Sequence, residues 1–189
     1  MNIFAVSHDV TECAEALCDK HLNKMIVETC QMLVTGLRVA GFDETKLPVT
    51  KAGTYWKATH QNHPCNIWMR VSSANWIWAF DYLQELLTEY SFRYCKQHSC
   101  QESVLYHLWD LTFKHENSRY ADLQIEQWVE KNLPNLSLTD FPQCMPDEFK
   151  VDGDSQKAYR NYYNGDRISA FAKWTNTDPP AWFTGAMIV

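Results

Sequence analysis

Three ionisable side chains fall close together in the first clearly patterned segment of the chain. His21, Lys24 and Glu28 are three and four residues apart, so a helix would bring them within about 60° of one another on one edge. At the rim of a core, desolvation favours a protonated carboxyl and a nearby lysine favours the ionised form, which tunes such a group for proton transfer. Glu28 is therefore our candidate general acid or base, with His21 and Lys24 beside it. The same spacing also fits a solvated Lys24–Glu28 ion pair next to a capping histidine.

A second polar cluster, His60, Asn62 and His63, ends a predicted loop over residues 41–64. Two histidines three apart, with His21 elsewhere, could supply three nitrogen ligands to zinc. The helical HExxH frame is missing, so we favour a polar active-site or loop-shaping role and predict no metal and no cofactor.

A third cluster near the C-terminus interleaves aromatic and basic residues. Such a mixture suits stacking on a base while pairing with its phosphate. An amphipathic helix that docks its tyrosines on the core would have the same composition. The cluster comprises Tyr159, Arg160, Tyr162, Tyr163, Arg167, Lys173 and Trp174.

The charge balance sets limits on nucleic-acid binding. The net charge of -6 argues against tight, non-specific binding of duplex DNA, which needs a basic surface. Charge is segregated, however, because residues 102–148 hold nine acids and three bases, whereas residues 150–173 hold five bases and three acids. The C-terminal segment therefore stays a candidate phosphate contact.

The seven cysteines form no CxxC pair, so we expect free thiols rather than a disulfide framework or a zinc knuckle. No apolar run approaches the ~20 residues of a membrane span, and the first ten residues lack the features of a signal peptide. We expect a cytoplasmic protein without membrane contact, in the host cytoplasm if a phage encodes it.

The hydrophobic pattern predicts a mainly α fold in a single compact helical domain over residues 1–189. The 46% apolar content is ordinary for a globular chain, and strand-like alternation is nearly missing. A polar loop is expected at 134–146. We predict helices at residues 10–39, 65–96, 101–114, 120–132, 155–163 and 167–174, the last two separated by Asn164-Gly165.

Several of these residues together resemble the phage-type pyrimidine-dimer DNA glycosylases of the endonuclease V type, of which this chain would be a divergent member. Each matching motif is short, but the motifs keep their order across nearly the whole chain. They are Asp19-Lys20-His21-Leu22 followed by Lys24, Glu28 and Gln31; Asn62-His63-Pro64 followed by Trp68; Asp140-Phe141-Pro142-Gln143; and Tyr159-Arg160-Asn161-Tyr162-Tyr163-Asn164-Gly165.

The resemblance implies a compact helical fold and excision of a damaged or modified pyrimidine from DNA through an imine on the chain's own α-amine, with abasic-site lyase chemistry. The candidate catalytic residues are then Met1 as the amine nucleophile, Glu28 as acid and base, and His21 and Lys24 beside them. A base is flipped from the duplex in such reactions. The candidate substrate-binding residues are His60, Asn62, His63, Trp68, Tyr159, Arg160, Tyr162, Tyr163 and Lys173.

Two other classes of function fit the same residues. An enzyme that modifies free nucleotides would use the aromatic residues to cage a base and arginine to bind its phosphate. A non-catalytic protein that binds nucleotides or a host factor would use the same pocket without chemistry. DNA or a nucleotide is thus the expected partner, and the sequence leaves the oligomeric state open.

Overall fold

The computed structural model describes residues 1–112, 125–134 and 136–185, and in these ranges the protein is mainly α, as predicted. The only strand-like pairing there is an isolated bridge between Val49 and Tyr55. The α-helices are α1 (Val10–Ala16), α2 (Asp19–Val39), α3 (Pro64–Val71), α4 (Ser73–Tyr94), α5 (Tyr106–Thr112), α6 (Ile125–Asn132), α7 (Ser155–Asn164) and α8 (Asp166–Ser169); shorter turns are η1 (Glu44–Lys46), η2 (Gln101–Leu105) and η3 (Asp147–Phe149).

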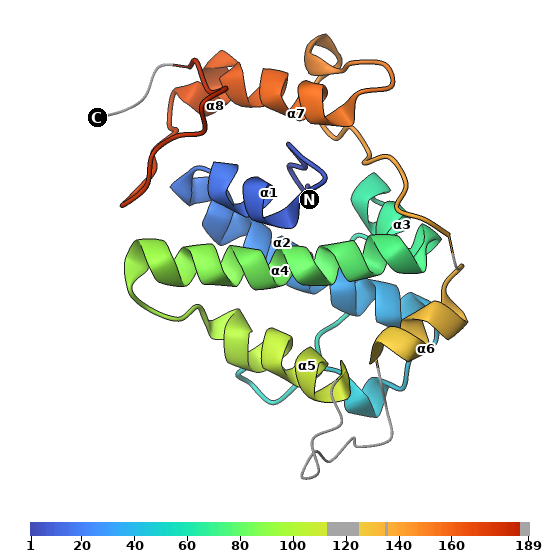
Figure 1. Cartoon of the computed structure of the whole chain (residues 1–189). Coiled ribbons are helices and arrows are strands. Elements are labelled where there is room, and N and C mark those ends of the chain that lie inside the picture. The colour runs from blue at the N-terminus through green and yellow to red at the C-terminus, as the bar shows by residue number, and fades with distance from the viewer. Residues whose placement is uncertain (113–124, 135, 186–189) are drawn as a thin grey trace.

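Helices α2 and α4 form the centre of the molecule and pack against each other (Figure 1). Both carry an apolar stripe at helical spacing, which explains why they face one another. Gly36 on α2 lies against the fully buried ring of Trp76 on α4, and a Cβ at position 36 would just reach van der Waals contact with that ring, at 3.4 Å. Helix α1 packs against α4, and α3 packs against both α2 and α4. These contacts hold α2 in position, and with it the candidate residues that it carries.

The predicted helix at 10–39 is wrong as a single element, because the chain is extended at Leu17 and Cys18 and divides it into α1 and α2. The buried guanidinium of Arg93 stabilises this break. It donates to the carbonyl oxygen of Leu17 at 2.7 Å and to that of Glu15 at 2.9 Å, and it pairs with Asp19 at 3.2 Å. A residue from α4 thus satisfies the backbone groups that the break exposes.

The predicted helix at 65–96 is also divided, here at Ser72. That residue is extended, and its hydroxyl accepts the N–H of Ala74 at the start of α4 and donates to the carbonyl of Leu136. A serine that caps a helix in this way competes with continuation of the preceding helix. The interruption turns α3 and the loop before it toward α2.

The remaining helices follow the predictions more closely. Helix α7 and the break at Gly165 are as predicted, but α8 ends at Ser169 rather than at 174. Elements η2 and α5 cover the prediction at 101–112, and α6 that at 125–132. The predicted segments 113–114 and 120–124 lie outside the described residues.

The N-terminal segment is buried between α2 and α7 rather than lying on the surface. Ile3, Ala5 and Val6 are at most 1% exposed, and the ring of Phe4 stacks on His21 of α2 and on Tyr162 of α7. The beginning of the chain is therefore part of the core, close to the middle of the molecule (Figure 1).

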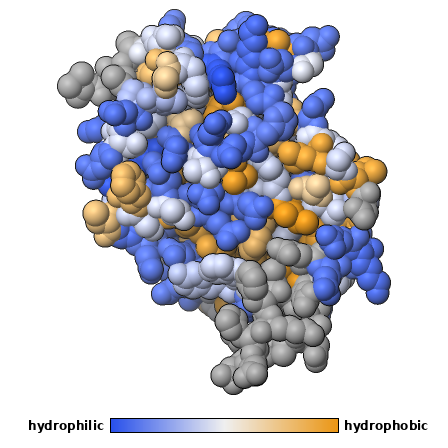
Figure 2. Space-filling model, viewed as in Figure 1, coloured by the Kyte–Doolittle hydropathy of each residue, from blue (hydrophilic) through white to orange (hydrophobic). Residues whose placement is uncertain are grey.

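None of the described helices is both long and apolar enough to cross a membrane. Hydrophilic residues cover most of the face shown in Figure 2, and apolar residues gather over the region of α3, where Ile67 and Val71 are 42% and 40% exposed.

Candidate active site at the chain N-terminus

The α-amine of Met1 lies beside the carboxylate of Glu28. The amine nitrogen is 3.7 Å from Oε1 of Glu28, and the backbone N–H of Asn2 donates to Oε2 at 2.9 Å. Lys24, one helical turn before Glu28, places Nζ 3.6 Å from the same Oε1. One carboxylate thus faces a primary amine, a backbone N–H and a lysine, and the structure brings Met1, Lys24 and Glu28 together.

The Met1 side chain is an anchor, while its main chain faces solvent. The side chain is 1% exposed, and its sulfur accepts a hydrogen bond from Nδ2 of Asn66 at 3.1 Å. Because the residue as a whole is only partly buried, its exposed surface belongs to the main chain, where the amine is. A reactant could therefore reach the amine without displacing the side chain.

Asn2 helps to hold the amine in place through its backbone N–H and both polar atoms of its side chain. Its Oδ1 accepts the N–H of Ile3 at 2.8 Å, and its Nδ2 donates to the carbonyl of Cys144 at 2.9 Å. Sequence reasoning missed both Asn2 and Asn66, since neither lies at a telling spacing from Glu28. The Asn62-His63-Pro64 motif two residues before Asn66 was the nearest available signal.

A histidine and two thiols border the amine. Cys65 Sγ and Cys144 Sγ are 3.4 Å apart, and a ring nitrogen of His63 lies within 4.8 Å of both sulfurs. Burial and the Met1 ammonium lower the pKa of His63. Contact with the Cys65 thiol lowers the pKa of Cys144, whereas the same contact and burial raise that of Cys65.

His21 lies on α2 but faces an aromatic cluster. Its Nδ1 is 2.9 Å from the hydroxyl of Tyr163, and its ring stacks on Phe4 with 4.3 Å between centroids. Burial, with smaller contributions from Lys24 and Lys20, lowers the pKa of His21 to about 4. Its hydrogen bond thus goes to α7 and not to Glu28, and a catalytic role for His21 stays a prediction.

The loop residues predicted to bind substrate occupy the outer side of the site. His60 and Asn62 are exposed, and Nδ1 of His60 is 2.7 Å from the hydroxyl of Thr59. His63 accepts the N–H of Cys65 and so caps α3, the loop-shaping role that the sequence left open. The carbonyls of Thr59 and His60 accept from Asn66, which connects this loop to Met1.

Three of the predicted binding residues are buried. Trp68 packs against Trp78 and Phe141, the hydroxyl of Tyr159 donates to the carbonyl of Pro142, and Tyr163 is fully buried against His21. The docking of tyrosines on the core, weighed above as the alternative, describes Tyr159 and Tyr163 well. Substrate contact by these three residues would require their rings to become accessible.

Of the other members of the C-terminal cluster, Trp174 is buried and donates to the carbonyl of Ala16, whereas the rest are partly or fully accessible. Arg160 donates to the carbonyl of Val6 and lies 5.7 Å from the ring centre of Trp182. Tyr162 is half-buried against Phe4, and Lys173 is exposed. Arg160, Tyr162 and Lys173 thus stay candidate contacts for a bound polyanion.

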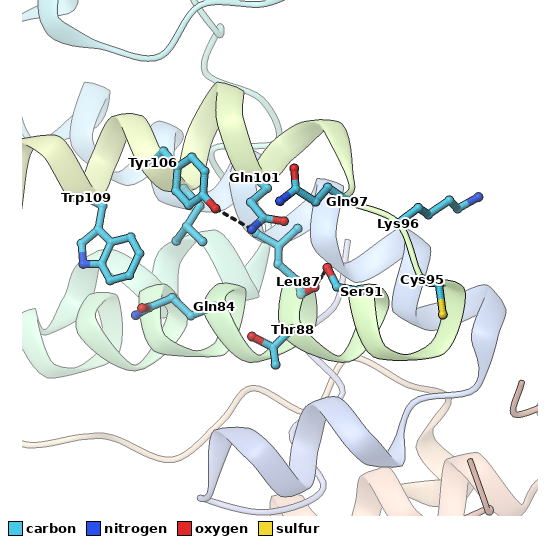
Figure 3. Close-up of a pocket in the computed structure, with 11 residues that line it drawn as sticks. Gln84, Leu87, Thr88, Ser91, Cys95, Lys96, Gln97, Gln101, Tyr106 and Trp109 are labelled. Atoms are coloured by element: carbon cyan, nitrogen blue, oxygen red, sulfur yellow. Dashed lines mark hydrogen bonds between the residues drawn. The ribbon is translucent and has the colours of Figure 1, made fainter. Parts of the chain in front are cut away.

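A pocket of about 510 Å³ lies elsewhere, between α4 and the η2–α5 segment (Figure 3). Gln84, Thr88 and Ser91 line it from α4, and Gln101 and Tyr106 line it from the opposite side. None of the residues that surround the amine lines this pocket. The amine site is instead partly open at the surface, as a large substrate would require.

Comparison with known proteins identifies the family. The family model described as pyrimidine dimer DNA glycosylase matches residues 1–102, which is more than half of the chain and includes Met1, Glu28 and His63. No curated protein and no solved structure gives a match. The chain belongs to the pyrimidine dimer DNA glycosylase family.

Proposed function

We propose that the protein is a DNA glycosylase that removes a damaged or modified pyrimidine by using the α-amine of Met1 as the nucleophile. The observation that carries the proposal is the 3.7 Å separation between that amine and the carboxylate of Glu28, with the amine on the accessible side of a buried anchor. Primary amines attack sugar carbons only when uncharged, so a carboxylate within reach of the amine proton is the group that the reaction needs.

The uncharged amine would attack C1′ of the lesion nucleoside, and the glycosidic C–N bond would break with its electron pair leaving on the base. The base takes up a proton from solvent. Glu28, after releasing to solvent the proton that it took from the Met1 ammonium, accepts a second proton from the Met1 nitrogen now bonded to C1′. It passes this proton to O4′ as the C1′–O4′ bond opens. The product is a protonated imine between Met1 and the sugar.

Lys24 supports this chemistry electrostatically. Its Nζ lies 3.6 Å from Glu28, and its side chain is 54% exposed, so it can face both the carboxylate and a phosphate. An exposed pair of this kind contributes little to stability, about 1 kcal/mol or less. The position of Lys24 is therefore better explained by the site than by the fold.

The substrate fits an open site rather than a closed pocket. The amine, His60 and Asn62 lie at the surface, and the half-buried Arg160 and Tyr162 lie across the N-terminal segment on α7. A duplex can span such a surface after a nucleotide is flipped, at a cost of a few kcal/mol. A damaged pyrimidine is easier to flip than an intact one, which favours a lesion as the substrate.

The test is borohydride trapping, because borohydride reduces the imine to a stable amine. We would offer DNA with abasic sites, ultraviolet photoproducts and modified pyrimidines, and locate the adduct by mass spectrometry of the N-terminal peptide. We expect an adduct on Met1. No adduct with any of these substrates would reject the proposal and favour nucleotide binding on the same scaffold.

Glu28→Gln tests the role of the carboxylate. We expect adduct formation to slow by about 100-fold or more, because general acid–base catalysis contributes roughly 10²–10⁴-fold. Circular dichroism should show an unchanged helix content. Glu85→Gln is the matched control, since Glu85 is a half-buried glutamate on α4 outside the site. Equal rates for the two variants would remove Glu28 from the mechanism.

A further inference from the structure

We infer that the chain binds one zinc-class divalent cation at a site formed by His63, Cys65 and Cys144. Neutral imidazole and thiolate are the ligands that zinc prefers, and three protein ligands leave a fourth position for water or another donor. Within the described residues, this is the group of histidine, cysteine and acidic side chains placed closely enough to share an ion.

The spacing of the donor atoms agrees with tetrahedral coordination. With Zn–S bonds of about 2.3 Å, two cysteine sulfurs on one zinc ion lie roughly 3.7 Å apart. The two sulfurs here are 3.4 Å apart. The donor atoms of all three residues lie within 4.8 Å of one another, and a bound ion would draw the His63 nitrogen toward the two sulfurs, because a Zn–N bond is about 2.0–2.1 Å long.

The two thiols are not joined in a disulfide, which requires about 2.05 Å between sulfurs. The segments that carry them are held in place. The carbonyl of Cys144 accepts from Asn2, and Cys65 lies in the first turn of α3 with its N–H bonded to His63.

The fold brings these ligands together from segments that are distant in the sequence. His63 and Cys65 begin α3, whereas Cys144 comes from the loop before η3, 79 residues beyond Cys65. An ion bound here would tie that loop to α3 directly beside Met1. Since Cys144 and His63 are only partly buried, the site has an entry path for the ion.

The experiment titrates the full reduced chain, without DNA, with Zn²⁺ in competition with a chromophoric chelator and with Co²⁺ followed by its thiolate charge-transfer absorption. We expect one equivalent of either ion to bind. Cys65→Ser and Cys144→Ser should each weaken Zn²⁺ binding on the order of 100-fold and reduce the charge-transfer band, whereas loss of both thiols should abolish the band. Because no DNA is present, the result is independent of the glycosylase proposal.

Two further variants keep the test decisive. Cys144→His replaces a sulfur ligand by a nitrogen ligand, so this variant should still bind Co²⁺ with a weaker thiolate band. Binding by this variant would exclude misfolding as the cause of the losses in the serine variants. Cys100→Ser is the matched control, because Cys100 contacts Cys30 in a second thiol pair. A reduced wild-type chain that takes up no zinc, or zinc binding that survives loss of both Cys65 and Cys144, would overturn the inference. So would a 65–144 disulfide in a chain that binds no zinc once reduced.

Discussion

At the scale of single residues, Asn2 determines where the amine points. Its backbone N–H fixes Glu28, its side-chain oxygen accepts from the next residues of the chain, and its side-chain nitrogen binds the loop at Cys144. Catalysis by an amine depends on the distance and direction from its nitrogen to the reacting carbon, so loss of this positioning should lower the reaction rate.

Asn2→Leu keeps the approximate size of the residue. It removes the side-chain hydrogen bonds to Ile3 and Cys144. We expect the rate of borohydride-trapped adduct formation to fall about 10-fold to 100-fold, while binding of lesion DNA changes little. Asn132→Leu, at an exposed site on α6, is the control. An unchanged adduct rate would show that the amine does not need Asn2.

His21 should make stability depend on pH. Its pKa is about 4 in the folded protein against 6.5 ordinarily, so the unfolded chain binds the proton first as the pH falls. The contribution of neutral His21 to the free energy of unfolding is therefore complete above pH 6.5. It falls by up to about 3 kcal/mol as the pH drops from 6.5 to about 4. Urea unfolding from pH 7.5 to 4.5 should show this slope, and His21→Gln should flatten it. Equal slopes would contradict the prediction.

Much of the candidate site could not be predicted from spacing alone. Lys24 and Glu28 are four residues apart on one helix, so the sequence alone predicts their contact as an ion pair. Met1, the neighbour of Glu28 in the proposed mechanism, is 27 positions away in the sequence, and only the family resemblance points to it. The pairing of Cys65 with Cys144 spans 79 residues and has no local pattern.

At the scale of elements, the break between α1 and α2 depends on one buried cation. Arg93 is fully buried and pairs with Glu89 at 2.6 Å and with Asp19 at 3.2 Å, in addition to its bonds to backbone carbonyls. Removing one member of such a network leaves buried charge without a partner, which typically costs 3–5 kcal/mol.

Arg93→Met should therefore lower the free energy of unfolding by about 3–5 kcal/mol, measured by chemical denaturation. Lys150→Met is the comparison, because Lys150 pairs with the exposed Asp147 at the surface and its loss should cost about 1 kcal/mol or less. Similar losses for the two variants would show that Arg93 is not what stabilises the break.

The Arg93 network illustrates why the sequence predicts that these helices form but not where they break. The apolar stripes along 10–39 and 65–96 correctly predicted helices, since burial drives both. The interruption at Leu17 contains neither proline nor glycine, and the group that stabilises it comes from α4. At Ser72 the cap was visible in the sequence, but a serine inside an apolar pattern is an ambiguous signal.

At the scale of the whole molecule, the net charge of -6 should keep DNA binding modest and dependent on a few cations. We expect a plot of log K against log salt for lesion duplex to have a slope of roughly -2 to -4, about -0.9 for each phosphate contacted. Fluorescence anisotropy between 50 and 200 mM salt would measure it.

Lys24→Gln should reduce the magnitude of that slope by about one, whereas Lys131→Gln, at an exposed site on α6, should not. A slope near zero for the unmodified protein would indicate a small nucleotide ligand instead of a duplex.

The burial of Phe4 links activity to the completion of folding. Phe4 has a positive φ of 45°, which is strained for a non-glycine residue, and its ring is held by His21 on one side and Tyr162 on the other. These two neighbours are distant in sequence, so the N-terminal segment is held on both sides only when α2 and α7 are both folded against it. The amine proposed as the nucleophile should therefore be fully positioned only in the completely folded chain.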